Sequence, residues 1–583
     1  MANGFGSFYV GNSGLQSAQN ALNVTANNLA NVNTTGYVRE QVIFSDKQYQ
    51  TFRQGTATTN IQQNGLGVSI GDVVHARDIF LDKAYRLENG RSAFYSTSYT
   101  TVEQIYDLFQ EMNGQEFKEC IKDLSTAFQE LAKAPGDSVN QNLVIQKSEL
   151  FVSRSQALYS DLQSYQSNMN EQIKEAVERI NEIGDRIYEL NLYIQKVESG
   201  SVETAMTARD ERDALLDELA SYGNVSTRED QYGFVWVDFE GAEFVQEYRC
   251  NNIALKADNG TGFYTPYWPH LSDTAHEQYV SVCRVDTDIS SENNTDIGSL
   301  KALVYHRGTG YGRYTDLEDP QAYKAIEDCV MMETEAQIDL LFHTMVTSLN
   351  DLFCPNTTAG EDLGIAQGQT VTAYDAAGHA YTISSDTKVL DSKNCNVGAD
   401  KELPPQELFA RLGCERYTTV TYTDADGKQQ TAYLYNEENP DDSSTMYQIG
   451  SVQVNSALLQ QETLLPTWQQ NGAVDYNLGD RISETWSAQG MLLNPKDNSP
   501  SNFQGYYDRV ISNLGTAGNV YYSESQTLGN TVNSLNNQRL QVMGVSSDEE
   551  LTNMVRYQAA YNAASRYISV ISEMTQLIVT GLI

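Results

Sequence analysis

Histidine and cysteine are the side chains here that could hold a metal ion or act as nucleophiles, and their spacing favours neither role. The histidines are His75, His270, His276, His306, His343 and His379, and the cysteines are Cys120, Cys250, Cys283, Cys329, Cys354, Cys395 and Cys414. No Cys-x-x-Cys pair occurs, and no histidine stands at ligand spacing from another candidate ligand. Seven cysteines cannot all pair within one chain, so buried free thiols are favoured over a disulfide framework. We expect no metal site and no cofactor.

Two glycine-containing segments match ligand-binding loops only in part. Asp424, Asp426 and Gly427 could begin a calcium loop, but the later oxygen ligands are missing and both flanks are strand-like, which favours a hairpin turn. The segment 308–312 is rich in glycine but lacks the Gly-Lys-Ser/Thr ending of a phosphate loop, which favours a linker. With 77 acidic residues, carboxylate pairs arise by chance. We therefore expect no catalytic residue and no enzymatic activity.

Composition narrows the class of partner. The formal net charge is -39, and the sequence pI is near 4.4. A nucleic-acid surface needs a basic stripe, and none is visible, so we expect no nucleic acid. We also expect no membrane insertion, because no run of eighteen apolar residues occurs. The N-terminus lacks the basic and apolar regions of a typical secretory signal.

The elements that organise the chain are heptad stripes at its two ends. Near the N-terminus, Leu15, Leu22 and Leu29 recur every seven residues, with Ala18, Thr25 and Val32 between them. The C-terminal stripe consists of Met554, Tyr557, Tyr561, Ala564, Ile568, Ile571, Thr575 and Ile578. A lone helix with one bare apolar face is marginal in water. We therefore expect the two terminal helices to pair with each other and then with neighbouring subunits.

Local signals predict where these helices end. Ser547 and Glu550 fit a capping box at the start of the C-terminal helix. Gly36 stands where a left-handed residue closes a helix, and a two-residue alternation that follows it predicts a strand. No charged residue precedes Arg39. The face opposite the leucine stripe is expected to carry asparagines instead: Asn20, Asn23, Asn27, Asn28 and Asn31.

The segment from Leu22 to Tyr37 resembles the N-terminal signature shared by flagellar rod, hook and hook-associated proteins. The signature residues are Asn27, Asn28, Leu29, Asn31, Asn33, Thr34, Thr35, Gly36 and Tyr37. The segment from Gly544 to Ile578 resembles the C-terminal helix of the same family. The resemblance is strong over about 1–220 and 500–583 and weak between them.

This resemblance implies a structural protein of the flagellar axis that joins the hook to the filament and assembles into a ring through its terminal helices. It implies as partners other copies of the chain, the hook protein, a filament-side hook-associated protein or flagellin, and an export chaperone on the C-terminal helix. It also implies an extracellular location, reached by type III export without a cleaved signal peptide. Two alternatives stay open: a hook or distal-rod protein of the same family, or a flagellum-mounted glycan-binding adhesin that acts through 355–465.

The expected fold is mixed and mainly α: terminal coiled-coil helices, a long antiparallel helical bundle built from both chain halves, and β-rich insertions. An Ile-rich seam runs through 173–197 and is interrupted by Gly184, at a cost of ~1 kcal/mol relative to Ala. Hairpins are predicted over 234–245, 370–383 and 420–435. The expected units are 1–45, a helix and following strand; 46–222, the first part of the bundle; 223–315, a β-rich domain; 316–354, a return helix; 355–465, a second β-rich insertion; 466–545, a linker and bundle helix; and 546–583, the C-terminal helix.

Overall fold

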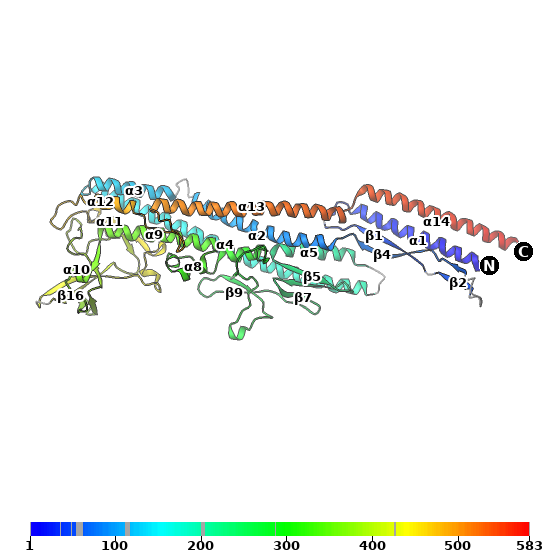
Figure 1. The fold of residues 1–583 in the computed structure, drawn as a ribbon, viewed down its shortest axis with the longest axis horizontal. Coiled ribbons are helices and arrows are strands. Elements are labelled where there is room, and N and C mark those ends of the chain that lie inside the picture. The colour runs from blue at the N-terminus through cyan, green and yellow to red at the C-terminus, as the bar shows by residue number, and fades with distance from the viewer. Residues whose placement is uncertain are drawn as a thin grey trace.

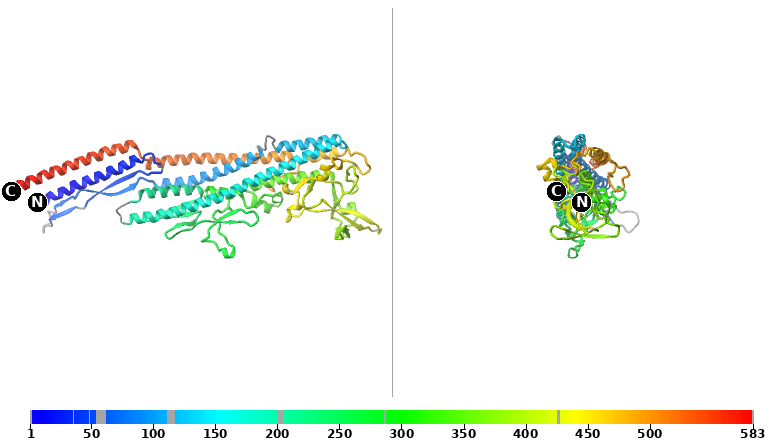
Figure 2. Two further views of the ribbon diagram at one scale, coloured as in Figure 1. Left: turned by 180° about the vertical axis from the view of Figure 1, so that it is seen from behind. Right: turned by 90° about the vertical axis from the view of Figure 1, so that its left-hand side faces the viewer.

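The protein is a long rod of helices that carries β-rich modules along one side (Figures 1 and 2). The computed structural model describes residues 2–34, 36–47, 49–53, 62–110, 117–199, 204–285, 287–424 and 427–581. Both chain ends lie at the same end of the rod (Figure 1). The predicted mixed, mainly α class is confirmed.

The shaft of the rod is an antiparallel bundle drawn from both halves of the chain. Its long helices are α2 (Ile79–Gln110), α3 (Phe117–Lys133), α4 (Ser138–Glu198), α5 (Met206–Tyr222), α9 (Val330–Phe353) and α13 (Phe503–Met543). α13 packs along α2, while α3, α5 and α9 pack against α4. α4 begins where the side chain of Asp137 accepts a hydrogen bond from the Val139 N–H at 3.0 Å. Its Ile-rich seam is buried, including Ile173, Ile180 and Ile187.

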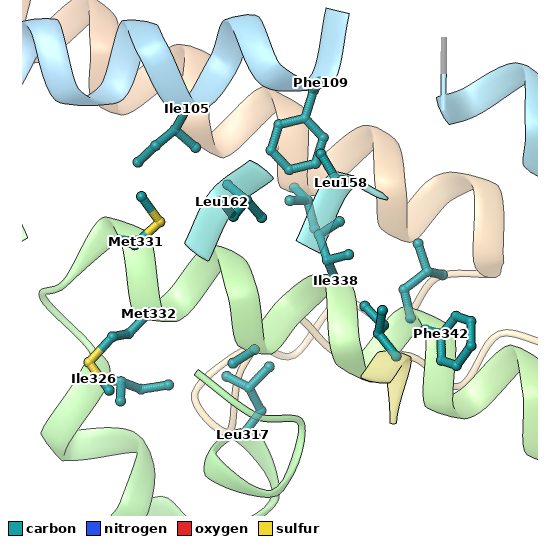
Figure 3. Packing of buried hydrophobic residues seen from close by; sticks show 14 of the residues in the cluster. Ile105, Phe109, Leu158, Leu162, Leu317, Ile326, Met331, Met332, Ile338 and Phe342 are labelled. Carbon is teal, nitrogen blue, oxygen red and sulfur yellow. The ribbon is translucent and has the colours of Figure 1, made fainter. Parts of the chain in front are cut away.

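The core of the shaft is a continuous apolar cluster. Figure 3 shows Ile105 and Phe109 of α2 above Leu158 and Leu162 of α4, with Ile338 of α9 close by. Each such side chain contributes roughly 1.5–3 kcal/mol when fully buried. The bundle is therefore held by apolar packing along its length.

The first β-rich module lies beside α4 and α5. Its sheet has the order β5 (Val225–Glu229), β6 (Val235–Phe239), β7 (Ala242–Gln246) and β8 (Arg249–Cys250), and β9 (Ala254–Ala257) pairs with β10 (Tyr264–Tyr267). The hairpin predicted over 234–245 is β6–β7. A Cβ on Gly184 would lie 2.3 Å from the Phe244 ring, so this glycine lets β7 pack directly on α4. The span expected to be β-rich also holds a helix, α6 (Ser299–Arg307), which packs against α2 and α4.

The second β-rich module is a six-stranded sheet near the far end of the rod. Its order is β11 (Asn356–Thr358), β14 (Lys388–Leu390), β17 (Gln429–Tyr435), β16 (Tyr417–Thr423), β12 (Thr370–Asp375) and β13 (Ala380–Ser384). The two hairpins predicted here, β12–β13 and β16–β17, lie next to each other because β12 pairs with β16. Asp426, considered as a calcium ligand, lies outside the described residues.

The remaining elements connect these parts. They are α7 (Thr315–Glu318), α8 (Pro320–Ile326), α10 (Ala359–Asp362), α11 (Ser456–Gln460), α12 (Leu478–Ser487), the strand pair β15 (Phe409–Arg411) and β18 (Val452–Val454), and the short 3-10 helices Thr274–His276, Ser443–Thr445, Ile449–Ser451 and Glu462–Leu464. None of the helices in the described ranges is both long enough and apolar enough to cross a bilayer.

A separate pair of antiparallel helices, formed by the two ends of the chain and called the terminal hairpin here, extends from one end of the shaft (Figure 1). It pairs α1 (Ala2–Ala30) with α14 (Ser547–Gly581), and the strands β1 (Glu40–Asp46) and β4 (Val68–His75) lie against α1. A further pair, β2 (Gln50–Arg53) and β3 (Gln62–Asn64), follows β1. α1 ends before Val32, which was expected in its seam and is instead exposed beyond the helix.

Candidate assembly site at the paired chain ends

The two terminal helices approach each other through small residues of α1. A Cβ on Gly11 would lie 2.8 Å from Ile568 Cγ1, and one on Gly14 would lie 3.8 Å from Ala564 Cβ. Residue numbers along α14 fall as those along α1 rise, so the two helices are antiparallel. The buried positions of α1 include Gly11, Ala18, Ala21 and Thr25. Together with Gly14 they keep a heptad spacing, so small side chains line this seam of α1.

The leucines predicted as the seam of α1 flank this surface. Leu15, Leu22 and Leu29 are half-buried. On α14, the predicted positions Met554, Tyr557, Tyr561, Ala564 and Ile568 are half-buried, Ile571 is buried and Ile578 is exposed. Ala18 and Thr25, which were predicted between these leucines, are buried. The other small residues of the surface, Gly11, Gly14 and Ala21, were not predicted, because glycine and alanine carry little apolar surface. Their signal was the repeat of small side chains at positions 11, 14, 18, 21 and 25.

Asn28 is the centre of the turn that leads from α1 into β1. Its amide donates to the Glu40 carbonyl oxygen at 2.9 Å, and its Oδ1 accepts from the Glu40 N–H at 3.0 Å and from the Tyr37 hydroxyl at 2.8 Å. The side chain is only 1% exposed. The expectation that Asn28 belongs to an outward asparagine face is wrong, because these hydrogen bonds require it to face the strand. Burial raises the pKa of Tyr37, which keeps its hydroxyl protonated as the donor.

The other signature residues support the same turn from outside. The Asn31 amide donates to the Asn27 carbonyl oxygen at 3.0 Å, and the Thr34 hydroxyl donates to Asn31 Oδ1 at 3.1 Å. Gly36 has φ +81°, a backbone conformation that side chains rarely adopt. Leu29 is half-buried, Asn33 is exposed and Thr35 lies outside the described residues. The signature therefore encodes a hydrogen-bonded change of direction.

Directly after this turn, the chain is tied to the shaft and to α14. The Arg39 N–H donates to the Met543 carbonyl oxygen at 2.8 Å, and the Arg39 guanidinium pairs with Glu549 at 2.8 Å. The Val38 N–H donates to the Asp210 carboxylate of α5 at 3.2 Å. α14 begins at the hydroxyl of Ser546, which accepts from the Glu549 N–H at 3.4 Å, so the capping serine precedes the predicted Ser547 by one residue.

A buried ion cluster joins three helices of the shaft, α13, α2 and α5, at the end of the shaft that adjoins the terminal helices. Arg539 of α13 pairs with Asp82 of α2 at 2.8 Å and with Asp217 of α5 at 2.7 Å, while its guanidinium lies 4.2 Å from the centre of the Tyr85 ring. Arg86 shares Asp217 at 2.7 Å. Arg539 is 5% exposed. Removing one partner of a buried pair leaves an uncompensated charge, so this cluster fixes how α13 meets α2 and α5.

His75 and Asp210 meet beside this cluster, with His75 Nε2 3.4 Å from Asp210 Oδ1. Burial lowers the pKa of His75 to about 4 and raises that of Asp210 to about 6. His75 is therefore neutral at pH 7. A cavity of about 640 Å³ opens nearby between β4, α2 and α5. Within the described ranges, no three His, Cys, Asp or Glu side chains converge as a metal site would require.

The outer face of the hairpin is apolar. Val555, Val570, Met574 and Leu577 of α14 lie on the side away from the seam and are exposed, Leu577 by 72%. Ile578 and Val579, on the seam side near the end of the helix, are exposed as well. After Glu550, the helix carries few charges: Arg556, Arg566 and Glu573. One partner helix covers only one side of α14, so this apolar surface is left in water. This exposed apolar surface of α14 could be buried by packing against another protein.

Three protein-family descriptions match parts of the chain. Residues 8–37 match "Flagella basal body rod protein", residues 102–365 match "Flagellar hook-associated protein FlgK helical domain", and residues 536–580 match "Flagellar basal body rod FlgEFG protein C-terminal". The first and third matches fall on α1 with its turn and on α14, and the second covers most of the shaft.

Individual proteins of other organisms are also similar to the chain. The chain is 22% identical to flagellar hook-associated protein 1 of Bacillus subtilis (strain 168), over 97% of this chain and 96% of the relative. It is 42% identical to the flagellar basal-body rod protein FlgG of the same organism, over 12% of this chain and 30% of the relative. A solved structure of the flagellar hook junction protein FlgK from Burkholderia pseudomallei matches with a TM-score of 0.46 and 12% identity, over 79% of this chain and 100% of that chain.

Proposed function

Because the chain belongs to the flagellar hook-associated proteins, we propose that it joins hook to filament by assembling with copies of itself through α1 and α14. The family consists of structural proteins of the flagellum. The similarity to hook-associated protein 1 extends over nearly the whole chain, whereas the rod-protein similarity covers 12% of it. This difference favours the junction over a hook or distal-rod role.

The exposed apolar face of α14 carries the proposal. A side chain such as Leu577 contributes roughly 1.5–3 kcal/mol when fully buried. Association costs about 4–15 kcal/mol in lost freedom of motion, so several such side chains must be buried together. α14 presents four named ones away from the seam, Val555, Val570, Met574 and Leu577, and two more, Ile578 and Val579, at the end of the helix. Burying this face against neighbouring subunits converts an unfavourable exposure into the contact that builds a ring.

The proposal also includes partners other than copies of the chain. The hook protein on one side and a filament-side hook-associated protein or flagellin on the other would meet the two rims of such a ring. Before secretion, an export chaperone would cover the apolar face of α14. The chain would then pass unfolded through the flagellar type III path to the cell exterior. In this role the protein acts as a structural part and catalyses no reaction.

Charge placed on this face tests the proposal. Leu577→Asp is expected to leave the monomer folded, because the side chain is already exposed, and to abolish self-association in sedimentation velocity and filament growth in cells. Leu271→Asp, which alters an exposed leucine of the first β-rich module, is the matched control.

A second pair of changes probes the inner seam. Ile568→Asp and Ile571→Asp should separate α1 from α14, leave the shaft folded by circular dichroism and also prevent junction formation. Normal filaments on cells that carry Leu577→Asp or the seam variants would contradict the proposed role of the terminal helices.

A further inference from the structure

Two long helices of the shaft have opposite kinds of surface. α13 carries one charged residue, Glu524, between Val510 and Gln538. Its exposed side chains there are mostly hydroxyls, amides and apolar groups: Ser512, Asn513, Thr516, Asn519, Val520, Tyr522, Thr527, Asn530, Ser534 and Asn537. α4, in contrast, exposes carboxylates, among them Glu171, Glu175, Glu178, Glu182, Asp185 and Glu189. The face of α4 is typical of a solvated helix, and the face of α13 is not.

The neighbouring helix extends the uncharged surface. α2 packs along α13 and has no charged residue from Ser92 to Val102. Tyrosines join the two helices: Tyr99 lies 5.2 Å from Tyr522 and Tyr95 lies 6.3 Å from Tyr521, measured between ring centres. Interfaces are enriched in tyrosine and depleted of charge at their centres. In Figure 1, α13 runs along the side of the rod opposite the β-rich modules.

We propose that this uncharged face, formed by residues 510–538 of α13 and 92–102 of α2, is a second contact surface between copies of the chain. Each copy carries a formal charge of -39, so two copies repel each other wherever carboxylates meet. The uncharged face is a long surface on which that repulsion is smallest. The inference rests on the proposed self-assembly and assigns to it a surface on the shaft in addition to the terminal hairpin.

The size of the contact supports a continuous interface along both parts. At ~1.5 Å per residue and a helix width of ~10 Å, one face of α14 offers roughly 500 Å² and residues 510–538 of α13 offer roughly 400 Å². A stable interface needs about 800 Å² per partner. α14 alone falls short of this area, whereas α14 and α13 together reach it. Residue 543 ends α13 and residue 547 begins α14, so the two surfaces follow each other along the rod.

Added charge on each helix tests the inference in the full chain. The variant with both Asn530→Glu and Ser534→Glu puts two carboxylates on the exposed face of α13. The variant with both Ser160→Glu and Ser164→Glu puts two on α4, at exposed serines with the same spacing, and is the matched control. Sedimentation velocity over a concentration series is expected to show self-association weakened at least tenfold by the α13 changes and nearly unaltered by the α4 changes. Hydrogen exchange should also show that 510–538 becomes protected when the wild-type chain assembles.

The outcomes separate the two proposals. If the wild type assembles and the α13 variant assembles equally well, the shaft contact is wrong and the role of α14 stands. If the α13 variant self-associates normally but no longer binds purified hook protein, the face serves that partner and the inference is again wrong. A wild-type chain that stays monomeric at every concentration would overturn both proposals.

Discussion

The close contact between α1 and α14 gives a sharp prediction, because two glycines on one helix face different neighbours. Replacing glycine by alanine inside a helix gains ~1 kcal/mol. At Gly14 the new methyl group would lie 3.8 Å from Ala564 Cβ, an ordinary contact, so Gly14→Ala should stabilise the hairpin by about that amount. At Gly11 it would lie 2.8 Å from Ile568 Cγ1 and 3.1 Å from Tyr567 Cδ1. Overpacking of this kind costs about 1–3 kcal/mol, so Gly11→Ala should give no gain or a net loss.

Amide hydrogen exchange of α1 in the monomer measures this difference directly, because it reports the free energy of local opening. Protection should rise in Gly14→Ala and stay level or fall in Gly11→Ala, with a gap of roughly 1–3 kcal/mol between them. Combining Gly11→Ala with Ile568→Ala makes room for the methyl group and should recover part of the gap. Equal protection in the two single variants would refute the packing described here.

Three further changes probe the turn, the shaft core and the ion cluster. Asn28→Ala should raise hydrogen exchange at the start of β1, because it leaves buried backbone groups unpaired at ~1–3 kcal/mol each, whereas the exposed Asn33→Ala should not; equal exchange in both would contradict the role of Asn28. Burial raises the pKa of Glu335 to about 8 from the ordinary 4.5, so the folded state binds more protons between these values and stability falls as pH rises. Glu335→Gln should remove a slope of ~1.4 kcal/mol per pH unit in urea unfolding between pH 5 and 8, and parallel curves for variant and wild type would count against this. Arg539→Met should lower the free energy of unfolding by roughly 3 kcal/mol, because two aspartates lose a buried partner; an unchanged urea midpoint would show that the cluster is not stabilising.

Much of the helical architecture could be predicted because its signals are local. The isoleucine repeat of α4 marks a buried seam, and the β6–β7 and β12–β13 hairpins follow from alternation around turn residues. α6 was missed because a nine-residue helix is too short to show a clear apolar period. Gly184 interrupts the isoleucine repeat, but the sequence does not show why a glycine is needed there. The reason is Phe244, which is sixty residues away in sequence and packs directly onto it.

The candidate site was predicted less completely. Leucine spacing located the helix, yet α1 meets α14 closely at Gly11 and Gly14, whose apolar content is too low to stand out in a hydrophobic pattern. The asparagine run was recognisable as a signature, but the inward orientation of Asn28 became visible only with β1 in place.

The sequence by itself determined that both ends form helices with an apolar stripe, since that information repeats every seven residues within one segment. Tertiary structure alone decided which faces meet and which remain uncovered. Arg539 pairs with Asp82, which is more than four hundred residues away in sequence, and Gly11 packs against Ile568, which is more than five hundred residues away. Such contacts depend on the relative placement of helices, which no local period encodes.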